Sequence, residues 1–157
     1  MQDPPIWQRL LAALAYLLPW SDAIPFGQGL FGPLPWLRWL ALPALPVLQL
    51  QEMVPFGSLL LFLLLFLAVV RNPRVPYGIR FNVLQAILID IVLVLLSLAF
   101  SILLAPLSGS LGFLVRTLQN TVFLGALLLV FYAVIQNLRG QQADIPTVSE
   151  AVRMQLL

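Results

Sequence analysis

The sequence predicts an all-α integral membrane protein: a bundle of four transmembrane helices with an interfacial or re-entrant segment after the first. Two observations predict this class. Hydrophobic residues make up 61% of the 157 positions and charged residues only 9%, at a mean hydropathy of +1.00, whereas soluble domains carry roughly 25% charged residues. Several apolar runs also approach or exceed the ~20 residues that a helix needs to cross a bilayer. We expect one membrane domain over residues 1–157.

The apolar runs give the spans in order. Residues 54–70, 81–104 and 118–138 are each predicted to form a membrane helix. Residues 6–26 are long enough for another, which is the first along the chain. That run contains Pro19 followed by the polar pair Ser21 and Asp22, so a kink or an early exit from the bilayer is expected there.

Residues 27–53 are harder to assign, because prolines recur and Arg38 stands between two tryptophans. A fifth span is the alternative. It would place Arg38 inside the membrane at a cost of at least ~2.5 kcal/mol, and each proline would interrupt its hydrogen-bond ladder. An interfacial or re-entrant segment is therefore predicted.

The arginines predict the orientation. With four spans, six arginines share one side of the membrane and two lie opposite, so the positive-inside rule places both termini on the cytoplasmic side. Arg71, Arg74 and Arg80 occupy one short loop on that side. They are interpreted as topology anchors or as binding groups for lipid headgroups, each contributing about 1 kcal/mol near an anionic surface. The six are Arg9, Arg71, Arg74, Arg80, Arg139 and Arg153.

One face of the third span is polar. At 100° per residue, Asn82, Asp90, Ser97 and Ser101 fall on one stripe, and Asp90 lies near the predicted midplane. Ionisable residues at that depth are usually functional or paired. Two hypotheses remain open: a polar translocation path, or a helix-packing face in which Asp90 hydrogen-bonds to a neighbouring helix, with Asn120 as a possible partner and small residues permitting close approach.

The residue types that are missing exclude several chemistries. The chain has no Cys, His or Lys, which removes disulfides, thiolate or Ser-His-Asp nucleophiles, the usual zinc and haem sites, Walker-type phosphate loops and Schiff bases. We therefore predict no catalytic residues, no metal and no cofactor, and we expect that the protein is not an enzyme. A net charge of +2 gives no indication of a nucleic-acid partner.

Residues 139–157 are predicted to form a cytoplasmic-side tail with a short helix. Thr147 and Glu150 have the spacing of a capping box, in which each side chain binds a backbone N–H at the start of a helix. A docking helix and an interfacial helix would both carry this pattern.

Three segments carry a family resemblance: AYLLPW at 15–20, RFNVLQA at 80–86 ahead of Asp90, and IPTVSEAVRMQ at 145–155. Together they resemble the twenty-kilodalton subunit family of the translocon at the inner envelope membrane of chloroplasts, the Tic family, in its cyanobacterial form. The resemblance runs from end to end. It implies a four-helix membrane protein that takes part in protein translocation or insertion, with both termini on the stromal or cytosolic side.

The resemblance also sets the expected partners. These are the lipid bilayer, other membrane-protein subunits or further copies of the chain, and precursor polypeptides, in a cyanobacterial plasma or thylakoid membrane. The alternative is a structural or assembly subunit of a larger, for example photosynthetic, membrane complex. Plant members carry a long transit peptide that this sequence lacks, so the chain is similar to the bacterial-type homologues.

Overall fold

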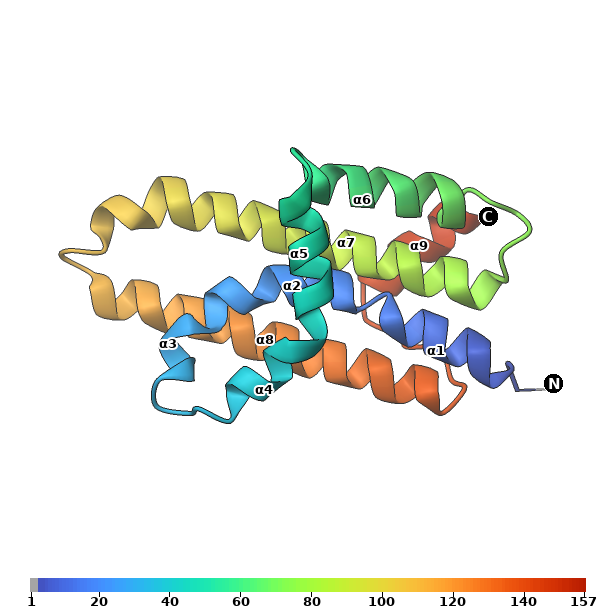
Figure 1. Ribbon diagram of the computed structural model, residues 1–157, viewed down its shortest axis with the longest axis horizontal. Helices are drawn as coiled ribbons and strands as arrows, with labels where there is room; N and C mark the ends of the chain where they lie inside the picture. The colour runs from blue at the N-terminus through green and yellow to red at the C-terminus, as the bar shows by residue number, and fades with distance from the viewer. Residues whose placement is uncertain (1–2) are drawn as a thin grey trace.

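The computed structural model describes residues 3–157, which are mostly helical and contain no β-strand (Figure 1). Three helical runs are long and apolar enough to cross a membrane: Ile6–Phe31, Tyr77–Leu107 and Gly112–Leu138. A bent pair of helices would supply a fourth crossing. The α-helices are α1 (Ile6–Leu14), α2 (Leu17–Ala23), α3 (Gln28–Phe31), α4 (Leu37–Ala41), α5 (Leu45–Met53), α6 (Gly57–Leu65), α7 (Tyr77–Ala99), α8 (Gly112–Leu138) and α9 (Val148–Leu156).

The outer surface of the helical bundle is apolar, as in a membrane protein, which confirms the predicted all-α membrane class. Large apolar side chains cover its outer surface; Leu128 is 72% exposed and Phe113 is 87% exposed. In water such a surface would drive aggregation. In a bilayer these side chains contact the lipid tails.

The first helical run is interrupted, as its proline predicts, but the interruption lies ahead of that proline. α1 ends at Leu14 and α2 begins at Leu17. Pro19 has no N–H, and its ring would clash with the carbonyl of Ala15 in a continuous helix. The chain therefore turns at residues 15 and 16. It then stays helical through Phe31, five residues beyond the predicted end of the span.

The bent pair is the largest departure from four straight spans. Residues 27–53 are mainly helical, and the helix over Leu37–Met53 meets the one over Gly57–Val70 at 110°. The second arm has nine α-helical and five π-helical residues, too few to cross a ~30 Å hydrocarbon core alone. In Figure 1, α5 crosses α2 and α6 runs beside the first half of α7.

Gly57 makes that bend possible. A β-carbon at this position would overlap the carbonyl oxygen of Gln51 from the preceding helix. The neighbouring Phe56 adopts a left-handed backbone conformation, with φ at 58°, which turns the chain between the two arms.

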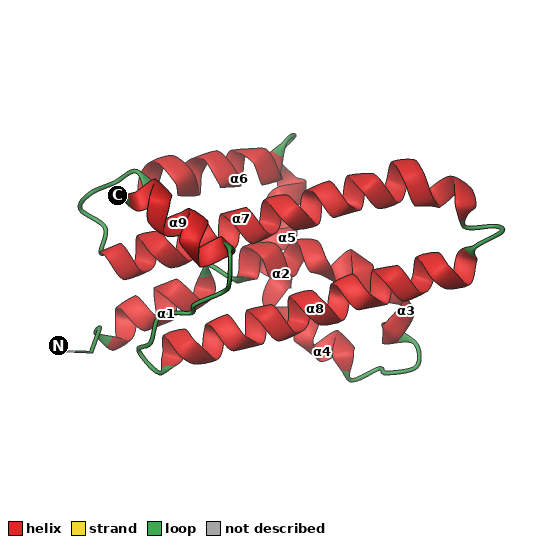
Figure 2. Cartoon of the chain, turned by 180° about the vertical axis from the view of Figure 1, so that it is seen from behind, coloured by secondary structure: helices red, strands yellow, loops and turns green. Residues whose placement is uncertain are grey.

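The two longest helices run antiparallel without packing closely on one another. α2 packs between α7 and α8 and contacts both (Figure 2). α8 ends in a Schellman motif, in which the N–H of Gly140 donates to Asn137 and the N–H of Gln141 donates to Gln136, both at 2.9 Å. Gly140 supplies the positive φ, 76°, that the motif requires.

Aromatic residues fill the core on the side away from the termini. Trp20 and Phe31 both pack on Phe123 of α8, with ring centroids 5.5 Å and 5.7 Å away, and Phe26 meets Phe100 edge-on at 5.5 Å. The indole N–H of Trp20 donates to the carbonyl of Leu40, 2.8 Å away. These contacts attach α4 and the end of the first run to the bundle.

The tail folds back on the bundle. After α8 the chain returns along α7 and forms α9, whose Val152 is fully buried and whose Arg153 lies over the ring of Phe81, 5.7 Å from its centre. Thr147 occupies the cap position of α9, but its side chain makes no hydrogen bond to the helix backbone. Both termini lie at one end of the molecule (Figure 1).

Candidate polar path

Five polar side chains from four parts of the chain meet inside the bundle. Tyr16 comes from the turn between α1 and α2, Asn82 and Gln85 from α7, Asn137 from the end of α8, and Ser149 from α9. All five are buried, and Tyr16, Gln85 and Ser149 have no exposed surface. We call this set the inner polar network.

Hydrogen bonds join every member of the inner polar network. The hydroxyl of Tyr16 donates to Oδ1 of Asn82 at 2.8 Å, and Nδ2 of Asn137 donates to the same oxygen at 2.9 Å. Nε2 of Gln85 donates to the Tyr16 hydroxyl at 2.8 Å and to the carbonyl of Ala143 at 2.9 Å. Ser149 donates to Oε1 of Gln85 at 2.6 Å. A buried network satisfied in this way fixes the relative positions of its helices.

Asp90 lies about two helical turns beyond Asn82 on α7. It is 6% exposed, and its carboxyl group lies close to that of Asp22 on α2. Within the described part of the chain, Oδ1 of Asp90 has no hydrogen-bond partner. The sequence suggested Asn120 as a possible partner; its side-chain oxygen instead lies beside Gly29, near the start of α8.

A polar pocket opens at the end of the bundle that carries the termini. Its volume is about 430 Å³. Arg9 and Gln8 of α1, Gln142 of the tail, and Asn82 and Asn137 of the inner polar network line it. We call it the proximal pocket. Its wall includes the outer surface of the inner polar network.

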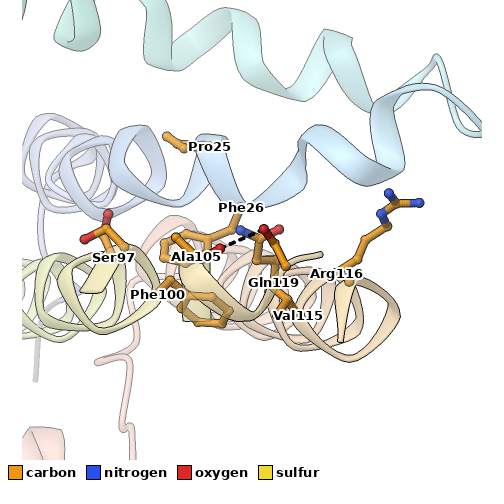
Figure 3. Close-up of a pocket in the computed structure, with 11 residues that line it drawn as sticks. Pro25, Phe26, Ser97, Phe100, Ala105, Val115, Arg116 and Gln119 are labelled. Carbon is orange, nitrogen blue, oxygen red and sulfur yellow. Dashed lines mark hydrogen bonds between the residues drawn. The ribbon is translucent and has the colours of Figure 1, made fainter. Parts of the chain in front are cut away.

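A second polar pocket, of about 440 Å³, opens toward the α7–α8 loop and is called the distal pocket. Figure 3 shows Ser97 from α7, Phe100 just after the end of α7, Arg116 and Gln119 from α8, and Pro25 across from them. Ser97 and Ser101 are exposed in this pocket. Among the described residues of this chain, no other helix packs closely on these two serines. The close helix packing suggested by the small-residue spacing stays a prediction.

The predicted polar stripe is therefore divided among three environments. Asn82 lies at the proximal pocket, Asp90 is buried between the pockets, and Ser97 with Ser101 lines the distal pocket. The stripe runs along one side of α7 and connects the two ends of the molecule. The packed centre, with Tyr16 and Gln85 fully buried, separates the two pockets.

The three loop arginines have different surroundings. Arg80 uses its Nε–H to bind the carbonyl of Val70 at 2.8 Å, which closes the connection between α6 and α7. Arg71 lies with Arg80 in a small pocket beside the C-terminus. Arg74 is exposed, at the mouth of an apolar groove.

Sequence reasoning missed most of the inner polar network. Tyr16, Gln85, Asn137 and Ser149 were not among the predicted site residues, nor was Asp22. For Tyr16 and Gln85 the available signal was a polar side chain with apolar neighbours on both sides; Asp22, Asn137 and Ser149 have polar neighbours in the sequence and gave no such signal. Of the predicted tail residues, Thr147 and Glu150 both remain exposed, while Ser149 between them is buried.

Comparisons with known proteins identify the family. The sequence profile described as "Chloroplast import apparatus Tic20-like" matches residues 1–152. The chain is 42% identical to a Tic20 family protein of Synechocystis, over 94% of this chain and 92% of that protein. It is 33% identical to Protein TIC 20-II, chloroplastic, of Arabidopsis thaliana, over 97% of this chain and 74% of that protein. The chain belongs to the Tic20 family.

The inner polar network joins the three segments that carried the resemblance to the Tic20 family. Tyr16 belongs to residues 15–20, Asn82 and Gln85 to 80–86, and Ser149 to 145–155. Three stretches far apart in this Tic20 family sequence therefore form one hydrogen-bonded unit. The protein is an integral membrane member of the family, and this unit holds its first helical run, α7 and the tail together.

Proposed function

We propose that this Tic20 family protein is the translocation or insertion subunit of a membrane protein-transport machinery, and that the polar stripe of α7 borders the polypeptide path. The observation that carries the proposal is the arrangement of the stripe. Its members open into polar pockets at opposite ends of the bundle, with Asp90 buried between them. A polar route from end to end is what a translocated polypeptide needs in an apolar medium.

The path is closed in this conformation. The packed inner polar network separates the pockets, so passage requires the helices on either side of α7 to move apart. Four helices enclose little space, so further copies or other membrane subunits complete the channel wall. The description of its family, which names a chloroplast import apparatus, supports this assignment of partners. Both termini are assigned to the cytoplasmic side by the arginine distribution.

The burial of the inner polar network favours a second candidate function. A buried, hydrogen-bonded core is also what a structural or assembly subunit would have, with the stripe serving only to pack helices. The two functions differ in one measurable property: whether water and polypeptide reach the stripe.

Single cysteines test water access, because the native chain contains no cysteine. Cysteine replaces Ser101 in the distal pocket and Gln142 in the proximal pocket, and Leu128 on the lipid-facing surface serves as the control. The translocation proposal predicts labelling of both pocket positions, but not of Leu128, by a hydrophilic thiol reagent in permeabilised membranes.

A photo-crosslinker tests for the polypeptide itself. It is placed at Ser97, which lines the distal pocket, and at Leu95, which is 60% exposed on another face of the same helix. Capture of nascent or precursor chains at Ser97 and only lipid at Leu95 would support the proposed path. Capture at Ser97 of only this protein's own helices or of one fixed complex subunit would reject it in favour of the assembly function.

A further inference from the structure

An apolar groove of about 510 Å³ lies between α1 and α6. Leu11, Leu14 and Leu18 form one wall, and Leu61 and Leu65 form the other. Val47 and Leu50 of the crossing helix α5 also line it. The groove belongs to neither polar pocket, and no member of the polar stripe lines it.

The groove has the depth of one leaflet of a bilayer. Its lining on the first helical run extends from Trp7 to Leu18, eleven positions, or ~17 Å at 1.5 Å per residue. Half of a hydrocarbon core is ~15 Å. α5 lies across the bundle where α6 begins (Figure 1), so Val47 and Leu50 limit the groove near the membrane centre. A straight groove of this depth fits one lipid acyl chain.

The positively charged side chain of Arg74 lies at the open end of the groove. Arg74 is the charged residue among those that line the groove, and within residues 3–157 it forms no ion pair with an acidic side chain. Two of the neighbouring basic side chains are engaged elsewhere: Arg80 binds the carbonyl of Val70, and Arg9 binds the carbonyl of Pro4. Trp7, half exposed beside the groove, is the kind of residue that sits at headgroup depth.

We propose that this groove is a binding site for an anionic glycerophospholipid, with one acyl chain along α1 and α6 and the phosphate on the guanidinium of Arg74. Charge complementarity distinguishes this occupant from a neutral lipid or an apolar helix. A second apolar groove, of about 450 Å³ between α1, α4 and α8, has no charged lining residue. It provides an internal comparison, because lipid there has no charged side chain to select its headgroup. The proposal does not depend on the translocation function.

Native mass spectrometry of the purified full chain tests headgroup selection. The probes are phosphatidylglycerol and phosphatidylcholine with identical acyl chains. The native protein should retain phosphatidylglycerol in preference, and Arg74→Gln should weaken that retention about five-fold, the factor expected from one arginine at a charged interface. Arg139→Gln is the matched control, because Arg139 is an exposed arginine at the end of α8. It should leave the preference unchanged.

A phosphatidylglycerol that carries a photoreactive group on its acyl chain locates the site. Crosslinks should map to Leu11, Leu61 and Leu65, and Arg74→Gln should reduce them. Equal retention of both lipids, an unchanged preference in Arg74→Gln, or crosslinks confined to the groove between α1 and α8 would overturn the proposal. Finding a second copy of the chain, or another polypeptide, crosslinked in place of lipid at a photo-reactive residue substituted for Leu61 would also overturn it.

Discussion

Ser149 on α9 donates a hydrogen bond to Oε1 of Gln85 on α7, 2.6 Å away, at a site where neither side chain has exposed surface. The same hydroxyl oxygen accepts the N–H of Ile145 at 2.7 Å. This relationship makes the C-terminal tail a part of the membrane bundle. Because Gln85 also binds Tyr16 and the carbonyl of Ala143, release of the tail would leave buried polar groups without partners.

Replacing Ser149 with alanine should therefore loosen the tail. The substitution leaves Oε1 of Gln85 and the N–H of Ile145 without their partner, and a buried polar group left unpaired costs about 1–3 kcal/mol. We expect a lower thermal unfolding midpoint in detergent. We also expect faster trypsin cleavage at Arg153, which lies on α9.

Thr147→Ala is the matched control for Ser149→Ala. Thr147 is exposed and makes no capping hydrogen bond to α9, so its loss should change stability by less than about 0.5 kcal/mol. An equal loss of stability in both variants would mean that the predicted capping box operates, and would contradict the assignment of the tail's anchorage to Ser149.

The contact between Tyr16 and Asn82 gives a second prediction. Tyr16→Phe removes two hydrogen bonds, but Oδ1 of Asn82 keeps Asn137 and Nε2 of Gln85 keeps the carbonyl of Ala143. Asn82→Ala removes the acceptor of both Tyr16 and Asn137. We expect Asn82→Ala to destabilise the protein more than Tyr16→Phe does.

A double-mutant cycle on Tyr16 and Asn82 isolates their interaction. Hydrogen bonds between membrane helices contribute about 0.6 kcal/mol on average, and a coupling energy of that order is expected from equilibrium unfolding. Additive effects of the two substitutions would show that the pair contributes nothing beyond its separate packing.

The sequence predicted the membrane class and the long helices because the free energy of inserting apolar residues is a sum over local positions. Residues 81–104 and 118–138 lie within longer helices, since polar flanks such as Arg80 and Arg116 continue the helix into the interface. The bend between α5 and α6 was beyond this reasoning. It depends on contact between Gly57 and the carbonyl of Gln51, which hydropathy does not contain.

The polar stripe also shows that local sequence patterns predict which residues share a helix face, but not which distant residues pack against that face. Helical periodicity correctly placed Asn82 and Asp90 on one face of α7 and gave no information about what would lie opposite them. The partners, Tyr16 and Asp22, come from the first helical run. In the tail, the capping-box spacing drew attention to Thr147 and Glu150, while the intervening Ser149 makes the buried contacts.

The bend itself gives a third prediction. In Gly57→Ala, the added methyl group would overlap the backbone of Gln51, which cannot move aside as a flexible side chain could. The arms of the bent pair should therefore separate. Spin labels on Leu50 and Leu64, both exposed, should report a changed distance distribution. Gly109→Ala, where a β-carbon meets nothing within 4 Å, is the control; a change as large in this variant would argue against a specific effect at Gly57.

The paired carboxyl groups of Asp22 and Asp90 give the last prediction, which separates charge from shape. An amide at position 90 keeps nearly the same size and can donate a hydrogen bond to the Asp22 carboxylate, which the acid does only when it holds a proton. Asp90→Asn should therefore unfold at a temperature equal to or above that of the native protein. Asp90→Leu should unfold lower, because it leaves the carboxyl group of Asp22 without the neighbour it has on α7. If Asp90→Asn were as destabilising as Asp90→Leu, the acid itself would be required for folding. If Asp90→Asn folds normally but loses crosslinking to precursor chains at Ser97, the carboxyl group acts in transport rather than in holding the bundle together.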